Sequence, residues 1–378
     1  MNDEQTASVT YTVPPAREAV LDQQLLRPEW TQRAVRDPRL LWLDKNENAD
    51  PQLGAIVQRV VREVDPVALG TYPECAPLYR KLASYLGVVP GKLLLAAGSD
   101  GVIRSVFEAF VNPGDVVMHT VPTFAMYSVY ARMYGARVAA LEYRRDEAGP
   151  SLPAGTVITA IADTRPKVVC LPNPDSPTGT VFPPDDLRRI VEAAGRSGAL
   201  ILIDEAYYPF YDRTALSWLD EYPHLVIART FAKAWGLAGL RIGYAVSSPT
   251  VAGLLHKVRP MYEVNTLAVA ATERMLDYDG DMLASVKRLN AGRDAFVAAM
   301  TRLGLRTLRT EGNFLHVAFG PAAPDVHRAL EGLVLYRKDA NEPCLSGYSR
   351  FTATTEERFE PIIRRIADAV RGSRRAER

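Results

Sequence analysis

Seven short apolar runs, separated by helical patterns, constrain the fold of this 378-residue chain more than any other feature. The runs lie at residues 93–97, 116–119, 137–141, 168–171, 200–204, 225–228 and 242–246. They are almost continuously apolar, as strands covered on both faces should be. Apolar residues recur with a 3.6-residue period between them, for example over 102–110 and 187–194. We therefore expect an α/β fold, with helices on both faces of a mostly parallel, seven-stranded sheet.

The rest of the chain is expected to form an arm and a second domain. A length of 378 residues suggests two domains. From about residue 264 the sequence is rich in Arg, Ala and Leu, with strand-like pieces at 314–318 and 333–336. We expect a smaller C-terminal α/β domain there. The boundaries that we predict are 1–45 for an N-terminal arm with part of the small domain, 46–262 for the large domain, and 263–378 for the small domain.

Composition excludes several classes of function. Lys and Arg number 45 against 44 Asp and Glu, so no strong field favours nucleic acid or a membrane surface. No apolar stretch approaches the roughly 18 residues of a membrane helix, and the first fifteen residues do not resemble a secretory signal. The three scattered cysteines fit a reducing cytoplasm, and the absence of CxxC or HxxxH spacing argues against a metal site. A cytoplasmic enzyme or binding protein is expected.

The strand-turn-helix sequence at residues 93–101 is the best local candidate for a phosphate site. No GxGxxG follows a strand, and residues 87–93 lack the spacing of a P-loop, which weakens the dehydrogenase and NTPase interpretations. Free amides at a helix start attract anions, and Ser99 and Asp100 stand at such a start. A simple turn with Ser99 or Asp100 as the helix N-cap explains the pattern equally well.

Three charged residues lie at or near the ends of the expected strands 200–204, 225–228 and 242–246, where a catalytic or ligand-binding role is plausible. Asp204 closes a buried strand, and such a carboxylate faces the crevice where parallel sheets bind ligands. It could hold a cation or a protonated ring nitrogen, or cap the next segment. Lys233 lies among apolar and small residues, which can lower the pKa of its amine toward a nucleophilic form. Arg241 offers a rigid fork for a phosphate, and the string 229–243 is more specific than a lone lysine.

Eight fragments, in the same order along the chain, carry a resemblance to a known family. They are Lys45-Asn-Glu-Asn48, Thr71-Tyr-Pro-Glu-Cys75, Gly98-Ser-Asp100, the segment 122–128, Pro177-Thr-Gly179, Asp204-Glu-Ala-Tyr207, the string 230–243, and 345–347 with Arg350. Together they resemble pyridoxal 5′-phosphate (PLP)-dependent aminotransferases of the aspartate-aminotransferase fold, most closely the histidinol-phosphate aminotransferases. The resemblance implies that fold, with a large PLP-binding domain and a smaller C-terminal α/β domain.

The resemblance also implies a role for each matched residue around the cofactor. Lys233 would bond to PLP and move the substrate proton, Asp204 would keep the ring nitrogen protonated, and Tyr207 would donate to the ring 3′-oxygen. Phe124 would stack on the ring. The phosphate would be bound by Ser99, Asp100, Thr230 and Arg241, and by Tyr72 of a neighbouring subunit. A homodimer with shared active sites is therefore expected.

Substrate contacts are implied for two arginines and one polar segment. Arg350 matches the arginine that holds the α-carboxylate, and Arg337 resembles one that meets the distal group of histidinol phosphate. An unrelated surface arginine would look like Arg337. Asn46, Glu47 and Asn48 resemble a segment that closes over substrate, and Asn48 is expected to contact it, although capping residues would look alike.

The sequence departs from the family pattern at several places. The loop 173–177 has no Asn directly before Pro-Thr-Gly, so either Asn173 or Ser176 must donate to the PLP 3′-oxygen, and we favour Asn173. Ala232 stands where many relatives have a phosphate-binding Ser, and Gly101 where they have an acidic residue. The segment 46–48 lacks a following proline. Such changes would suit a relative adapted to another amino acid, for example a guanidino amino acid of specialised metabolism.

The predicted activity is a two-step, ping-pong amino transfer. The substrates would be an L-amino acid, or an amino-alcohol phosphate such as histidinol phosphate, and a 2-keto acid. A decarboxylase resembling threonine-phosphate decarboxylase is an alternative with the same cofactor. A non-catalytic sensor or scaffold on this fold is a second alternative.

Overall fold

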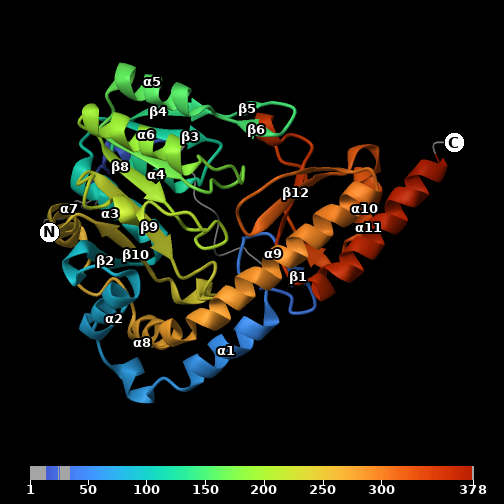
Figure 1. Cartoon of the computed structure of the whole chain (residues 1–378), viewed down its shortest axis with the longest axis horizontal. Helices are drawn as coiled ribbons and strands as arrows, with labels where there is room; N and C mark the ends of the chain where they lie inside the picture. Colours follow the sequence, from blue (N-terminus) through green and yellow to red (C-terminus); the bar gives the residue numbers. More distant parts are fainter. Residues whose placement is uncertain (1–13, 24, 26–34, 377–378) are drawn as a thin grey trace, which may run out of the picture.

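The computed structural model describes residues 14–23, 25 and 35–376. Figure 1 shows a large region of sheet and covering helices, and a smaller region that the long helix α9 (Asp279–Arg302) joins to it. Parts of the expected N-terminal arm, at residues 1–13, 24 and 26–34, and the end of the charged tail, at 377–378, lie outside the described residues.

Seven strands form the large sheet, and each corresponds to one of the expected apolar runs. They are β2 (Leu93–Ala96), β3 (Val116–Val121), β4 (Arg137–Glu142), β7 (Val168–Pro172), β8 (Leu200–Asp204), β9 (Leu225–Thr230) and β10 (Gly243–Ser247). Their order is β2-β10-β9-β8-β7-β3-β4, and each neighbouring pair is parallel unless it includes β10. The expected mostly parallel sheet is confirmed.

Helices cover both faces of this sheet, because successive side chains along a strand point to opposite faces. In β8, Leu200 and Leu202 join one apolar core, while Ile201 and Ile203 join the other. The first core contains α3 (Gly98–Phe110), α4 (Met126–Met133) and α7 (Pro249–Val258). The second contains α1 (Pro51–Arg62), α2 (Ala76–Leu86), α5 (Ala154–Thr164), α6 (Pro184–Arg196) and α8 (Thr266–Met275).

The edge strand β4 is covered less than we expected. Most of its side chains are exposed, and Val138 is 42% exposed although the run was predicted to be buried on both faces. Among the described strands β4 has β3 as its only neighbour in the sheet and therefore lies at the margin of both helical layers.

The smaller region is built on short strands and two helices. A three-stranded antiparallel sheet has the order β11 (Arg306–Leu308), β12 (Phe314–Ala318) and β14 (Ser349–Thr352). Near the N-terminus, β1 (Leu41–Trp42) pairs in parallel with β13 (Val334–Leu335). Helices α10 (Ala323–Ala329) and α11 (Glu356–Ala376) pack here, and β5 (Arg144–Arg145) and β6 (Pro150–Ser151) form a separate hairpin. Thus β12 and β13 match the two strand-like pieces.

The helix α9 contributes to both cores. Met282, Val286 and Leu289 pack with the large sheet, whereas Phe296 and Met300 pack with β12 and α11. Residues after the predicted boundary at 262/263 therefore still cover the large core. Within the described residues no helix, α9 included, is both long and apolar enough to cross a membrane.

Candidate active site

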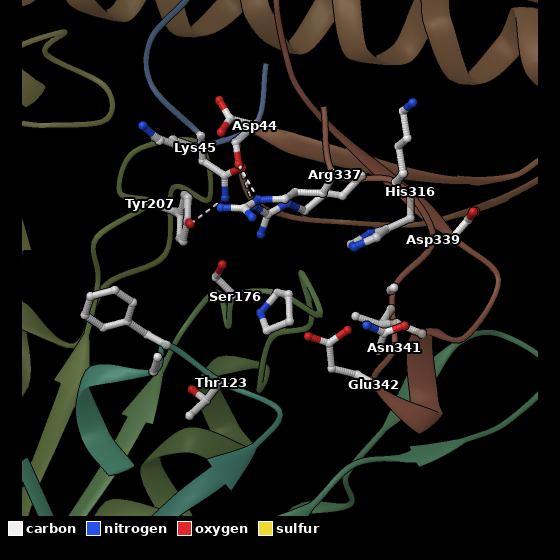
Figure 2. A pocket seen from close by; sticks show the side chains of 18 of the residues that line it. Asp44, Lys45, Thr123, Ser176, Tyr207, His316, Arg337, Asp339, Asn341 and Glu342 are labelled. Atoms are coloured by element: carbon white, nitrogen blue, oxygen red, sulfur yellow. Dashed lines mark hydrogen bonds between the residues drawn. The ribbon is translucent and has the colours of Figure 1, made fainter. Parts of the chain in front are cut away.

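A cavity of about 580 Å³ opens where the large sheet meets the smaller region (Figure 2). Four of its lining residues lie three or four positions beyond the carboxyl ends of parallel strands: Phe124 after β3, Ser176 after β7, Tyr207 after β8 and Lys233 after β9. The smaller region contributes the two expected arginines, Arg337 and Arg350. The crevice at the carboxyl ends of parallel strands is the usual ligand site of such sheets.

The Lys233 amine lies within this cavity. Its Nζ donates a hydrogen bond to the Lys45 carbonyl oxygen at 2.8 Å, and it lies 6.0 Å from the centre of the Tyr207 ring. The side chain is partly accessible from the cavity, yet burial of the amine, with the nearby charge of Arg350, lowers its pKa to about 8. A large share of the amine is therefore neutral and nucleophilic at mildly alkaline pH.

Asp204 lies behind the cavity wall as a buried carboxylate without a cation. It is the last residue of β8. Residues 200, 202 and 204 are alternate positions of this strand, so Asp204 points to the same face as Leu200 and Leu202, which is the face that α4 covers. There its Oδ2 accepts a hydrogen bond from Tyr127 at 2.9 Å, and its Oδ1 accepts from the Ala206 amide at 3.0 Å. No ion-pair partner lies among the described residues, and burial raises the pKa of Asp204 to about 6. A protonated nitrogen would be a fitting partner.

The Tyr207 hydroxyl lies between the two regions. Tyr207 is buried and accepts a hydrogen bond at 2.8 Å from the Nδ2 of Asn46. Burial raises the pKa of Tyr207, and the charge of Arg350 and a contact with the Ser176 hydroxyl, which lines the same cavity, oppose that shift. Two hydroxyl groups are thus available to a ligand oxygen at this point.

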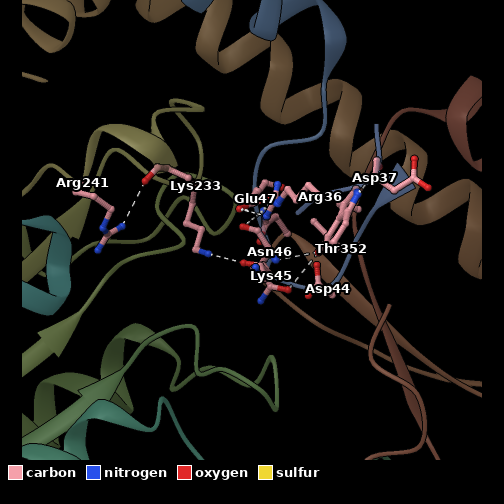
Figure 3. A network of polar contacts seen from close by, with 12 residues as sticks. Arg36, Asp37, Asp44, Lys45, Asn46, Glu47, Lys233, Arg241 and Thr352 are labelled. Carbon is pink, nitrogen blue, oxygen red and sulfur yellow. Dashed lines mark hydrogen bonds and ion pairs between the residues drawn. The ribbon is translucent and has the colours of Figure 1, made fainter. Parts of the chain in front are cut away.

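Residues 44–47 connect Lys233 to the smaller sheet (Figure 3). Asn46 has a left-handed backbone, with φ of 56°, and its amide donates to Thr352 of β14 at 2.9 Å. Its neighbour Glu47 forms an ion pair with Arg36 at 2.7 Å. A non-glycine residue in this conformation is held there by surrounding contacts. The Lys45 carbonyl that binds Lys233 is therefore fixed by tertiary contacts.

A second cluster forms where α3, β9 and β10 begin or end. At Gly243, the first residue of β10, an added Cβ would lie 2.6 Å from the Gly98 carbonyl carbon and 2.7 Å from the Ser99 amide. Only glycine permits this approach. Arg241 has φ of 55° and turns back to Gly98, where an added Cβ would lie 2.8 Å from its Nη2. No carboxylate among the described residues pairs with Arg241, so a free guanidinium meets the start of a helix, as suits a phosphate.

The other residues that we expected at the phosphate lie in this cluster. Helix α3 begins at Gly98 with Ala97 as N-cap and no side-chain cap, so Ser99 and Asp100 occupy its first turn and neither caps it. Asp100 accepts a hydrogen bond from Tyr130 at 3.1 Å. Thr230, the last residue of β9, is buried, and its hydroxyl accepts a hydrogen bond from the Ala232 amide at 3.1 Å.

A carboxylate from elsewhere in the chain occupies the space beside Gly101, where the acidic residue of the family pattern is missing. The Oε1 of Glu263 accepts a hydrogen bond from the Ala97 amide at 3.2 Å. An added Cβ at Gly101 would lie 2.7 Å from the same oxygen. Glu263 was not predicted at the site, because no local pattern in the sequence indicates that it returns to the start of α3.

Arg350 and Arg337 lie side by side across the cavity from the large sheet. They pair as backbone neighbours, and both donate to the carbonyl oxygen of Asp44, Arg350 through Nη2 at 3.0 Å and Arg337 through Nε at 3.2 Å. The Nε of Arg350 is buried without a partner among the described residues. Neither guanidinium forms an ion pair there, so both are available to an anionic group.

Three further residues expected at the site lie neither at the cavity nor in the second cluster. Asn173 is buried with both ends of its amide bonded to the Phe182 backbone, so the structure places Ser176, and not the favoured Asn173, at the cavity. Asn48 does not reach the substrate space, because its Nδ2 donates to the Ala234 carbonyl at 3.0 Å. Tyr72 is 71% exposed and stacks on Tyr262 with ring centres 4.1 Å apart.

Sequence analysis also missed cavity residues of the smaller region, chiefly His316, Asn341 and Glu342. His316 interrupts the apolar strand Phe314–Ala318, which was a usable signal. Asn341 and Glu342 lie in an irregular loop and carried none. Tyr127, the partner of Asp204, lies in the segment 122–128 that carries the family resemblance, but no role was assigned to it there.

The residues present fit the cofactor that the resemblance implies. The ring nitrogen of PLP could bind to the buried carboxylate of Asp204, which has no cationic partner among the described residues. The aldehyde carbon of PLP could react with the amine of Lys233, whose pKa is lowered. The phosphate of PLP could bind to the start of α3 and to the guanidinium of Arg241, which has no carboxylate partner among the described residues. Each group of PLP thus has a partner of suitable chemistry within one site.

Comparison with known proteins gives one family. The model of the family described as "Aminotransferase class I and II" matches residues 38–366. A histidinol-phosphate aminotransferase from Thermoanaerobacter pseudethanolicus is 31% identical over 324 residues, which cover 85% of this chain and 90% of that protein. One from Pectobacterium atrosepticum is 33% identical over 337 residues, with 85% and 89% covered.

Solved structures agree on the fold. Histidinol-phosphate aminotransferase from Sinorhizobium meliloti, crystallised with pyridoxal-5′-phosphate, superposes with a TM-score of 0.75 at 23% identity, covering 88% of this chain and 91% of that one. A mutant aspartate aminotransferase from Thermus thermophilus gives 0.74 at 21% identity, covering 94% and 100%. The expected aspartate-aminotransferase fold is confirmed.

Proposed function

The chain belongs to the aminotransferase class I and II family, and on that premise we propose that it is a PLP-dependent aminotransferase acting by a ping-pong mechanism. It would move an amino group from an L-amino acid, or an amino-alcohol phosphate, to a 2-keto acid. The observation that carries the proposal is the joint position of three residues that lie far apart in the sequence. Lys233 and Arg350 line one cavity, and the buried carboxylate of Asp204, behind its wall, is close enough to raise the pKa of Lys233 against the effect of burial.

Bound PLP would supply an electron sink for the negative charge that develops at the substrate Cα. Asp204 would hold a proton at the ring nitrogen. Tyr207, with Ser176 beside it, would donate to the ring oxygen. Lys233 would hold the cofactor and then move the proton to and from Cα, for which a pKa near 8 is well placed. Arg350 would bind and orient the anionic head of the substrate.

A single-turnover experiment tests the proposal. Mixing the PLP-loaded protein with one amino acid at a time should convert the cofactor to its amine form and release the matching keto acid. Release of carbon dioxide in place of keto acid would identify the decarboxylase alternative. A spectrum unchanged by every amino acid, with PLP still bound, would indicate the non-catalytic alternative.

We also propose a cytoplasmic homodimer, in which Tyr72 reaches the phosphate site of the partner subunit. Tyr72 and the neighbouring Met261 are 71% and 79% exposed, as residues that await a partner surface would be. The three cysteines are free, as a reducing compartment would keep them. A solution mass equal to one chain would contradict the dimer.

A further inference from the structure

We propose that the substrate side chain is cationic and rich in N–H donors, as in a guanidine or an amine, and that His316 and Glu342 recognise it. The inference rests on the proposed function, because it assigns the side-chain end of the same cavity. It follows from the distribution of charge along the cavity walls.

Both arginines of the site lie on one wall. Arg337 and Arg350 donate to the same oxygen, the Asp44 carbonyl, so their guanidinium groups lie together. One anionic head, a carboxylate or a phosphate, can therefore be shared by the pair. The remainder of the substrate then meets the other lining residues.

His316 lies next to this pair and has no partner of its own. In the β12–β14 ladder it stands directly opposite Arg350, so both side chains project from the same face of the sheet. His316 is 1% exposed, and neither ring nitrogen has a hydrogen-bond partner among the described residues. Figure 2 shows its ring turned into the cavity. A buried polar side chain without a partner is costly unless a ligand supplies one.

The His316 ring is neutral and can accept a hydrogen bond from a cation. Burial and the charge of Arg350 lower the pKa of His316 to about 3, and the Pro177 backbone opposes this shift less strongly. At physiological pH one ring nitrogen therefore donates and the other accepts.

Glu342 supplies a negative charge to the cavity lining, and this charge also raises the pKa of Arg350 against the effect of burial. Its carboxylate points into the cavity in Figure 2 and has no hydrogen bond or ion pair among the described residues. The neighbouring Asn341 adds an amide. Other charges of this loop are engaged elsewhere, because Lys338 pairs with Glu331 at 3.8 Å and Asp339 bonds to His327 at 3.0 Å. Asn341 and Glu342 thus offer acceptors and one negative charge without an ion-pair partner among the described residues.

Two amino acids of nearly equal shape test the inference. L-arginine and L-citrulline differ at the end of the side chain, where a charged guanidinium is replaced by a neutral urea. In single-turnover reactions of the PLP-loaded enzyme, we expect arginine to react at least about 10-fold more efficiently than citrulline or L-glutamate, as a charge-assisted contact would give. In Glu342→Gln the ratio of arginine to citrulline should fall to near one. In the control Glu331→Gln the ratio should stay unchanged.

A second variant separates recognition from folding. His316→Leu should slow both arginine and citrulline by about tenfold without lowering the melting temperature, since it removes a buried group that lacks partners. Citrulline or glutamate reacting as well as arginine, or a Glu342→Gln enzyme that keeps the wild-type ratio, would overturn the inference while leaving the aminotransferase intact. A failure of all amino acids to convert the cofactor would overturn the proposed function itself.

Discussion

Replacement of Lys233 by alanine is expected to abolish amino transfer, lowering kcat by at least about 10⁴-fold. The variant removes both the covalent attachment of the cofactor and an amine whose lowered pKa, about 8, suits proton transfer near neutral pH. Steady-state rates with the best amino donor would measure the loss.

The binding of PLP should survive this change in weakened form. Asp204, Arg241 and the start of α3 remain, so the protein should still retain PLP loosely, with the spectrum of the free aldehyde. Lys338→Ala is the matched control, because Lys338 borders the same cavity but pairs with Glu331. A Lys233→Ala enzyme that turns over near the wild-type rate would refute the assignment.

Asp204→Asn is expected to lower kcat/KM by about 10²–10³-fold, the usual cost of losing one electrostatic contact that acts in the transition state. Asparagine keeps the shape of the side chain and can still bond to Tyr127 and the Ala206 amide. It cannot hold a proton on the ring nitrogen. Pre-steady-state rates of Cα proton removal would show the effect directly.

The same substitution should stabilise the cofactor-free protein at neutral pH. Burial raises the pKa of Asp204 to about 6, above its unfolded value near 3.8, so ionisation costs the folded state stability above pH 6. That cost shrinks as the pH falls from about 6 toward 4. We therefore expect Asp204→Asn to raise the melting temperature of the cofactor-free protein at pH 8 more than at pH 4.5.

A lowered melting temperature at pH 8, together with near wild-type activity, would contradict the role of Asp204. It would mean that the carboxylate is a structural group with a compensated charge. The opposed effects on activity and stability separate the two roles.

The large sheet could be predicted from the sequence because its strands are continuously apolar. Residues 200–204, for example, coincide with β8, and the run 225–228 begins where β9 begins and ends two residues before it. The order of the strands could not be predicted, since local periodicity contains no information on which strands pair. The insertion of β10 between β2 and β9 follows only from tertiary packing.

The short strands of the smaller region were partly missed for a related reason. β11 has three residues and β14 has four, and both carry an arginine, so neither shows a clear apolar run. Their positions depend on pairing with β12, which was predicted.

Site residues could be predicted where motifs fix them and not where packing decides. Lys233 and Tyr207 follow strand ends within recognisable strings, and the structure places both at the cavity. Asn173 was favoured over Ser176, but the Phe182 backbone engages the Asn173 amide away from the cavity, which only the fold reveals. His316 and Glu342 come to the cavity through the antiparallel sheet and an irregular loop, which no local spacing indicates.

The central claim is that the Lys233 nitrogen is the one that carries PLP. Reduction of the PLP-loaded protein with borohydride, followed by peptide mass mapping, tests it most directly. We predict stoichiometric labelling of the peptide that contains Lys233 and no stable label on the peptide that contains Lys338. Labelling of another lysine, or no fixed label at all, would contradict the account.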